Sequence, residues 1–150
     1  MIPRIHPAFK LNGDSLNQEG VMIVASSYIK EGEEWERQIG DFLLNWLDNF
    51  DVVTVKTSGS TGTPQEYKLD KQHMINSAVM TGKYVDVGVE KDVLCCLPLS
   101  YIAGKMMLVR AMTLGWHLDL VEPSTMPLKK TEKCYDFTAM SPLQVSKSLD

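Results

Sequence analysis

The feature with the clearest chemistry is a segment of eight residues rich in hydroxyl groups and glycine, Thr57-Ser58-Gly59-Ser60-Thr61-Gly62-Thr63-Pro64. It directly follows an apolar run at residues 52–55. Glycine lets a ligand approach the backbone closely, and hydroxyl and backbone N–H groups donate hydrogen bonds to phosphate oxygens. These residue types suit a loop that holds the polyphosphate of a nucleotide, although the same composition also occurs in plain connecting loops.

The spacing of the glycines excludes one common kind of phosphate loop. Gly59 and Gly62 are three residues apart, and no lysine follows Gly62. The Walker-type loop instead requires Gly-x-x-x-x-Gly-Lys followed by Ser or Thr. Kinase-like and GTPase-like functions of the Walker type are therefore not favoured.

The order of the residues resembles the phosphate loop of the adenylate-forming enzymes, which include acyl-CoA synthetases, luciferases and peptide-synthetase adenylation domains. The pattern of that family is T-S-G-[ST]-T-G-x-P-K, and eight of its nine positions match this chain. The ninth position, lysine in the family, is Gln65 here. An amide brings no positive charge, and Lys56 or Lys68 could replace the missing one.

A second segment, Leu97-Pro98-Leu99-Ser100-Tyr101-Ile102-Ala103-Gly104, is similar to the family's L-P-L-F-H-x-x-G motif, which lines the acyl pocket. Ser100 and Tyr101 stand where the family commonly has Phe and His. The flanking sequence, from about Ile29 to Ser141, looks most like the o-succinylbenzoate–CoA ligases of menaquinone biosynthesis.

The resemblance implies an enzyme that activates a carboxylic acid with ATP and magnesium and transfers it to coenzyme A. It places the polyphosphate of ATP against seven loop residues: Thr57, Ser58, Gly59, Ser60, Thr61, Gly62 and Thr63. Tyr101, Gly104 and Lys105 would contact the acid. Lys105, or Arg110 on the same helix as a second choice, would pair with the second carboxylate of a diacid, or both are ordinary surface charges.

Other motifs of the family do not occur. The family has a glutamate motif for magnesium, an aspartate for the ribose and a lysine on a small C-terminal domain, and none of them is found in residues 1–150. We therefore expect one incomplete domain, the N-terminal portion of an AMP-binding domain, which is inactive alone. The alternatives are a non-catalytic nucleotide- or acyl-binding module left by truncation and, last, a plain scaffold.

Composition narrows the class of protein. The chain has 150 residues, 44% hydrophobic and 23% charged, with a net charge of −4. The charge favours neither nucleic acid nor an acidic membrane as partner, and no apolar run is long enough to span a bilayer. The three cysteines show no zinc spacing, and we expect reduced thiols, no metal site and a cytoplasmic location. The N-terminus shows no secretory signal.

Apolar periodicity and turn residues predict an α/β fold with a mostly parallel sheet and flanking helices. The residues near Val21–Val24 suit either a helix capped at Ser15 or a strand. The other expected helices are 35–47, 70–84, 101–114 and one beginning at Ser141-Pro142, and the expected strands are 52–56, 66–69, 93–97, 117–121 and 135–140. A partial sheet would leave edges that could pair with a second copy of the chain.

Overall fold

The fold is known from a computed structural model, which describes residues 5–57, 62–63 and 65–149. The elements, in chain order, are β1 (Lys10–Leu11), β2 (Asp14–Ser15), α1 (Gln18–Glu31), α2 (Glu34–Leu47), β3 (Val52–Thr57), β4 (Gln65–Asp70), α3 (Lys71–Val85), β5 (Asp92–Cys95), α4 (Ile102–Leu114), β6 (His117–Leu120), the 3-10 helix η1 (Pro127–Lys130), β7 (Phe137–Ala139) and α5 (Pro142–Ser148).

A five-stranded sheet has the order β2-β1-β6-β5-β7. The β1–β6, β6–β5 and β5–β7 pairs are parallel, and only β1–β2 is antiparallel. The predicted α/β class with a mostly parallel sheet is confirmed. Two-residue strands β1 and β2 were not predicted, because segments this short have no measurable periodicity.

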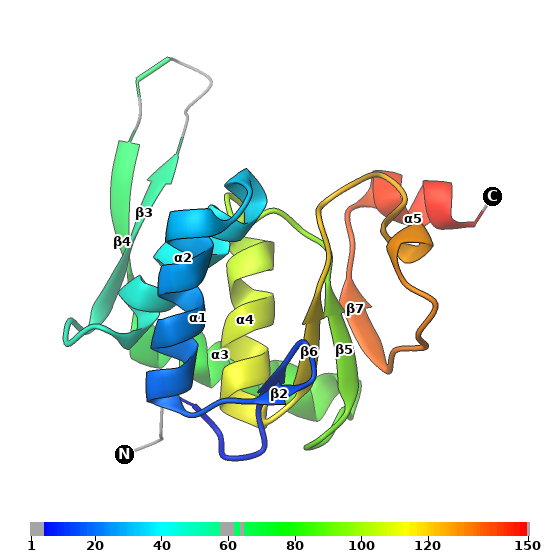
Figure 1. Cartoon of the computed structure of the whole chain (residues 1–150), viewed down its shortest axis with the longest axis horizontal. Coiled ribbons are helices and arrows are strands. Elements are labelled where there is room, and N and C mark those ends of the chain that lie inside the picture. Colours follow the sequence, from blue (N-terminus) through cyan, green and yellow to red (C-terminus); the bar gives the residue numbers. More distant parts are fainter. Residues whose placement is uncertain (1–4, 58–61, 64, 150) are drawn as a thin grey trace.

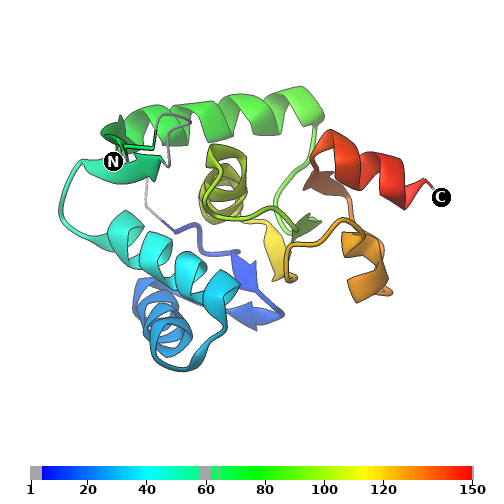
Figure 2. The ribbon, with the colours of Figure 1, turned by 90° about the horizontal axis from the view of Figure 1, so that it is seen from above.

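Helices α1, α2, α3 and α4 form a layer on one side of the sheet (Figure 1). Helix α4 contacts β5, β6 and β7 and packs along α3, while α1 and α2 pack against each other. Figure 2 shows α4 between α3 on one side and the α1–α2 pair on the other. This central position explains why α4 is apolar on most of its faces, with Met107, Val109 and Met112 fully buried.

Several helix ends follow predicted capping chemistry. Asp70 accepts a hydrogen bond from the His73 backbone N–H at the start of α3, and Gly115 ends α4 in the left-handed conformation with φ of 73°, where glycine is favoured. At α5, Ser141 and Gln144 form the expected capping box. The N-terminal cap differs, because Asn17 caps α1 and Ser15 lies in β2.

The two strands β3 and β4 form a separate antiparallel hairpin. Figure 1 shows the strands of this hairpin on the far side of the helices from the five-stranded sheet. Val53 and Val55 of β3 are buried, while most of β4 is exposed. Burial of one face of β3 is what attaches this two-stranded unit, since an isolated hairpin is at best marginally stable in water.

Within the described residues, no helix combines the length and the apolar character that a membrane-spanning helix requires.

Candidate functional site

The Gly-rich segment is the connection of the β3–β4 hairpin. The antiparallel register runs from Val52–Asp70 to Thr57–Gln65, so the last paired residues are Thr57 and Gln65. Ser58 to Thr61 and Pro64, four of them predicted phosphate ligands, lie outside the described residues. Gly62 has φ of 79°, a conformation that favours glycine, and a Cβ added there would meet no atom within 4 Å.

Gln65 is the first residue of β4. It stands where the adenylate-forming enzymes have lysine. Lys68 is exposed on the same strand. Three residues separate them, and alternate residues of a strand point to opposite faces. Lys68 therefore projects from the other face of the hairpin and lies about 10 Å along the strand from Gln65. It does not replace the missing lysine.

The predicted acyl segment crosses from the carboxyl end of β5 to the start of α4. Leu97 and Leu99 are buried, whereas Tyr101 is 61% exposed. In Figure 1 this connection lies at the end of the sheet toward which the hairpin also points. The carboxyl ends of parallel strands are the usual place for ligands in open α/β sheets. The described ends of β3 and β4 that flank the Gly-rich segment therefore point toward the same end of the molecule as the acyl segment (Figure 1).

Gly104 is set by close packing. A Cβ at this position would overlap the Pro98 carbonyl oxygen, so a larger residue would force the start of α4 away from the preceding loop. The Tyr101 carbonyl accepts hydrogen bonds from the backbone N–H groups of Gly104 and Lys105, at 3.1 and 3.2 Å. The glycine thereby lets the loop fold tightly on the first turn of the helix.

Lys105 is half-buried one turn into α4, and its Nζ donates a hydrogen bond to the Leu99 carbonyl. Burial lowers the pKa of the Lys105 amine, because the charged form is desolvated. A cavity of about 260 Å³ adjoins this side chain. Its lining residues come from α2, β3 and the acyl segment: Gln38, Asp41, Phe42, Asn45, Thr54, Leu99, Ser100 and Lys105.

Arg110 lies farther along α4. Its Nη1 is 3.9 Å from the Met107 sulfur, and its Nε is buried without a hydrogen-bond partner among the described residues. Desolvation lowers the pKa of the guanidinium. The described ion pairs do not include Arg110. Since a guanidinium stays charged in proteins, Arg110 is a partly buried cation without a described counter-ion.

Gln144 was not predicted as a site residue, but it joins the carboxyl ends of three strands. Its buried amide donates to the Cys96 and Ser124 carbonyls at 3.0 and 2.9 Å. Its oxygen accepts from the Ser141 N–H at 3.0 Å. The only sequence signal was the Ser141 capping box. It does not reveal the contacts with Ser124 and Cys96, which lie 20 and 48 positions earlier in the chain.

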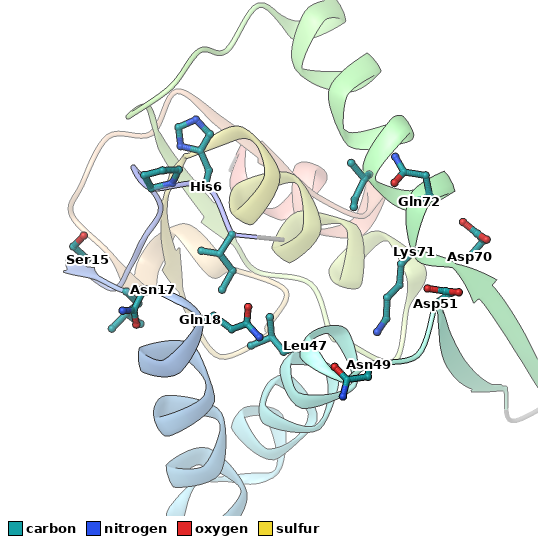
Figure 3. Close-up of a pocket in the computed structure, with 14 residues that line it drawn as sticks. His6, Ser15, Asn17, Gln18, Leu47, Asn49, Asp51, Asp70, Lys71 and Gln72 are labelled. Atoms are coloured by element: carbon teal, nitrogen blue, oxygen red, sulfur yellow. The ribbon is translucent and has the colours of Figure 1, made fainter. Parts of the chain in front are cut away.

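The largest cavity described, about 970 Å³, lies elsewhere, beside the N-terminal ends of α1 and α3 (Figure 3). Its buried amine, Lys71, is already paired with Asp48 at 2.7 Å. Asn17 and Asp70 already cap the two helix ends. None of the predicted site residues lines this cavity, so it is not the candidate site.

The described residues contain no group of three or more His, Cys, Asp or Glu side chains that could hold a metal ion. Cys95, Cys96 and Cys134 are free thiols, as the sequence predicted.

Comparison with known proteins supports the resemblance to adenylate-forming enzymes. No protein-family model matches the chain, and no curated protein matches it significantly. A solved structure of an acyl-CoA synthetase (AMP-forming)/AMP-acid ligase II-like protein from Dyadobacter fermentans is 35% identical, with a TM-score of 0.71 over 84% of this chain and 36% of that one.

Two o-succinylbenzoate-related structures are also similar. MenE from E. coli, solved with a phenylether-linked analogue of OSB-AMS, is 15% identical, with a TM-score of 0.66 over 97% of this chain and 51% of that one. This likeness shows the fold alone. The o-succinylbenzoate CoA synthetase (MenE) from Bacillus subtilis is 26% identical, with a TM-score of 0.43 over 48% of this chain and 19% of that one.

This chain covers 36% of the Dyadobacter protein and 51% of the E. coli one, so it spans well under two thirds of either. The similarity in sequence and in fold confirms the predicted resemblance to the adenylate-forming superfamily, and the chain has the α/β fold of part of a domain of such an enzyme.

Proposed function

We propose that the chain is part of an ATP-dependent acid–CoA ligase of the o-succinylbenzoate–CoA ligase type, acting in menaquinone biosynthesis in the cytoplasm. One observation carries the proposal. The Gly-rich segment that matches the family's phosphate loop connects the two strands of a projecting hairpin. The chain around it is 35% identical to an AMP-forming acyl-CoA synthetase-like protein.

In this proposal the hairpin connection holds the phosphates of ATP. Activation of an acid builds negative charge on the leaving pyrophosphate, and donors placed around that charge lower the barrier. Thr57 and Thr63 would supply hydroxyl groups, and the glycines would let the phosphates approach the backbone N–H groups. Ser58, Ser60 and Thr61 would supply the remaining hydroxyl groups.

The acid would lie against Tyr101, Gly104 and Lys105. Tyr101 is exposed and offers both a ring for stacking and a hydroxyl for hydrogen bonding. We propose Lys105 or, as a second choice, Arg110 as the partner of the second carboxylate of a diacid. Lys105 already donates to Leu99, whereas the Nε of Arg110 has no described acceptor.

ATP, magnesium and coenzyme A are the co-substrates and cofactor of this proposal. Magnesium in such sites is held by one or two carboxylates together with the phosphates of the substrate, and the described residues hold no group of three or more possible metal ligands. The role of this chain would be to bind phosphates and to contact the acid, not to carry out the full reaction alone.

A second candidate function is a non-catalytic nucleotide- or acyl-binding module. Gln65 favours it, because the loop then lacks the positive charge that the family places beside the phosphates. The two functions share the phosphate loop and differ in turnover.

Calorimetric titration with ATP and with pyrophosphate tests the shared step. We expect binding that is lost in a Thr57→Val, Thr63→Val double variant and kept in Thr125→Val, an exposed control outside the loop. Equal binding by the two variants, or no binding by the natural chain, would reject the phosphate loop. Pyrophosphate release with ATP, magnesium and an aryl acid separates the candidates only in a protein that also supplies the remaining ligase motifs, since we expect no turnover by this chain alone.

A further inference from the structure

The buried side chain of Gln144 reaches two loops at the carboxyl ends of neighbouring strands. It is 5% exposed. Its Nε2 donates to the carbonyl oxygen of Cys96 at 3.0 Å and to that of Ser124 at 2.9 Å. Cys96 directly follows β5, and Ser124 lies in the connection after β6. One amide therefore ties the chain together where two adjacent parallel strands end.

This junction needs the chemistry of a carboxamide. Two carbonyl oxygens meet at one point, and each needs a donor, because a buried acceptor without one is costly. The NH2 group supplies both donors, while the amide oxygen accepts the Ser141 N–H at 3.0 Å. An aliphatic side chain would supply no donor, and a carboxylate would place negative charge against two carbonyl oxygens. Gln144 therefore holds the two loops at a fixed separation.

The acyl segment begins at the residue after Cys96, and each part of it sets the next. The Tyr101 N–H donates to the Pro98 carbonyl at 3.1 Å. A Cβ at Gly104 would overlap that same oxygen. The position of Pro98 thus sets the turn that presents Tyr101, which is 61% exposed. A shift of the chain at Cys96 would move this whole succession of contacts.

We propose that Gln144 is a positioning residue for the acyl segment: its amide fixes the chain at Cys96 and thereby places Tyr101. Gln144 acts through the backbone and does not touch the acid. The placement of the segment follows from the hydrogen bonds of the amide, and its effect on acid binding rests on the proposed ligase function.

Amide hydrogen exchange of the free ¹⁵N-labelled chain tests the placement without a ligand. Gln144→Met should lower the protection of the Tyr101 and Gly104 amides by about tenfold relative to that of helix α3, because the donor at Cys96 is lost. Comparison with α3 cancels any general loss of stability. Unchanged relative protection would overturn the positioning role.

Ser141→Ala is the matched control for support of α5. The Ser141 hydroxyl accepts the Gln144 backbone N–H at 3.3 Å, so its removal weakens the start of the helix and leaves both carbonyl bonds of the amide. The relative protection of Tyr101 and Gly104 should not change. An effect equal to that of Gln144→Met would show that Gln144 only supports α5.

Gln144→Glu keeps the proposal testable if the methionine variant does not fold. Burial raises the pKa of a carboxyl group, so a fall in pH protonates it. The neutral acid can again donate one hydrogen bond and accept the Ser141 N–H. The relative protection of Tyr101 and Gly104 should therefore return toward that of the natural chain as the pH falls. A ratio independent of pH would contradict the positioning role.

Titration with o-succinylbenzoate and with pyrophosphate, at a temperature where every variant is folded, tests the consequence for binding. Gln144→Met should weaken o-succinylbenzoate by about tenfold and leave pyrophosphate unchanged, since a general defect would weaken both. Ser141→Ala should change neither. If exchange responds as expected but the natural chain binds no o-succinylbenzoate, the ligase proposal fails and the placement of the segment by Gln144 stands. Acid affinity unchanged in Gln144→Met would overturn the positioning role.

Discussion

The side-chain amide of Gln144 donates to the Cys96 carbonyl at 3.0 Å, and so joins α5 to the chain directly before the acyl segment. The same amide group donates to Ser124 at 2.9 Å. A buried glutamine with every polar atom bonded holds the carboxyl ends of neighbouring strands in place. Removal of the amide leaves buried carbonyls without a donor, and such groups are costly.

Gln144→Leu should therefore lower the free energy of unfolding by about 2–3 kcal/mol, as measured by urea denaturation. Gln72→Leu is the matched control, since Gln72 is exposed and bonds only Asn76 in the described contacts. Its effect should stay below about 0.5 kcal/mol. Similar losses in the two variants would show that the three contacts of Gln144 add nothing.

Lys71 and Asp48 form an ion pair, and the loss of either side chain should lower the free energy of unfolding by a different amount. Lys71 has a side chain 6% exposed, and Asp48 one 32% exposed, with 2.7 Å between Nζ and Oδ1. Asp48→Ala leaves a buried ammonium and should cost about 3 kcal/mol or more. Lys71→Met leaves a carboxylate that water can reach and should cost less.

Thermal or urea unfolding of the two variants gives the comparison. The exposed pair Lys130–Glu122, at 3.5 Å, serves as reference, and Lys130→Ala should change stability by less than about 1 kcal/mol. A larger loss in Lys71→Met than in Asp48→Ala would contradict the expected order.

The three cysteines should differ in reactivity. Cys95 and Cys96 are buried and Cys134 is exposed, and burial raises the pKa of the Cys95 and Cys96 thiols. A thiol reagent such as Ellman's reagent at pH 8 should modify one cysteine rapidly in the native protein and all three in guanidinium chloride. Rapid loss of two or three native thiols would contradict this, and Cys134→Ser should abolish the fast phase.

The same burial predicts an alkaline limit to stability. Burial raises the pKa of Cys95 from 9.0 to about 12, so the folded state holds a proton that the unfolded state loses. The Cys95 contribution is complete below pH 9 and declines as the pH rises toward 12. The slope is at most roughly 1.4 kcal/mol per pH unit. Cys95→Ala should show a shallower fall of the unfolding free energy above pH 9, and an unchanged slope would contradict it.

Much of the helical layer was predictable because the signals were local. Asp70, Gly115 and the Ser141 capping box each set a helix end through contacts within four residues. The N-terminal strands were not predictable, since β1 joins the sheet through parallel pairing with β6, more than 100 residues away. Asn17 caps α1 rather than Ser15, because Ser15 belongs to β2, where it pairs with Lys10 of β1.

The candidate site was predictable only where its signal was local in the sequence. The hairpin connection was expected from its composition and its match to a family pattern, and the register confirms that it joins two antiparallel strands. The cavity beside Lys105 was not predictable, because Asp41 and Asn45 reach it from a helix about 60 residues earlier in the chain. The apolar periodicity of α2 indicated only that this helix has one apolar face. It did not indicate which element the polar side of the helix meets.

Gln65→Lys should strengthen binding of ATP and pyrophosphate. Gln65 is paired with Thr57 at the end of the hairpin, so a lysine there starts its side chain beside the proposed phosphate site. An amide donates a hydrogen bond without charge, whereas an ammonium adds charge-assisted bonds to phosphate oxygens. We expect a gain on the order of tenfold in affinity, which corresponds to about 1.4 kcal/mol.

Calorimetry at low and high salt measures both the gain and its electrostatic origin, since an added ion pair weakens as salt rises. Gln72→Lys adds the same charge on α3, outside the hairpin, and controls for general attraction of anions to a less acidic protein. Equal gains in the two variants would show that position 65 does not face the phosphates, and a gain confined to Gln65→Lys would place them at the hairpin connection.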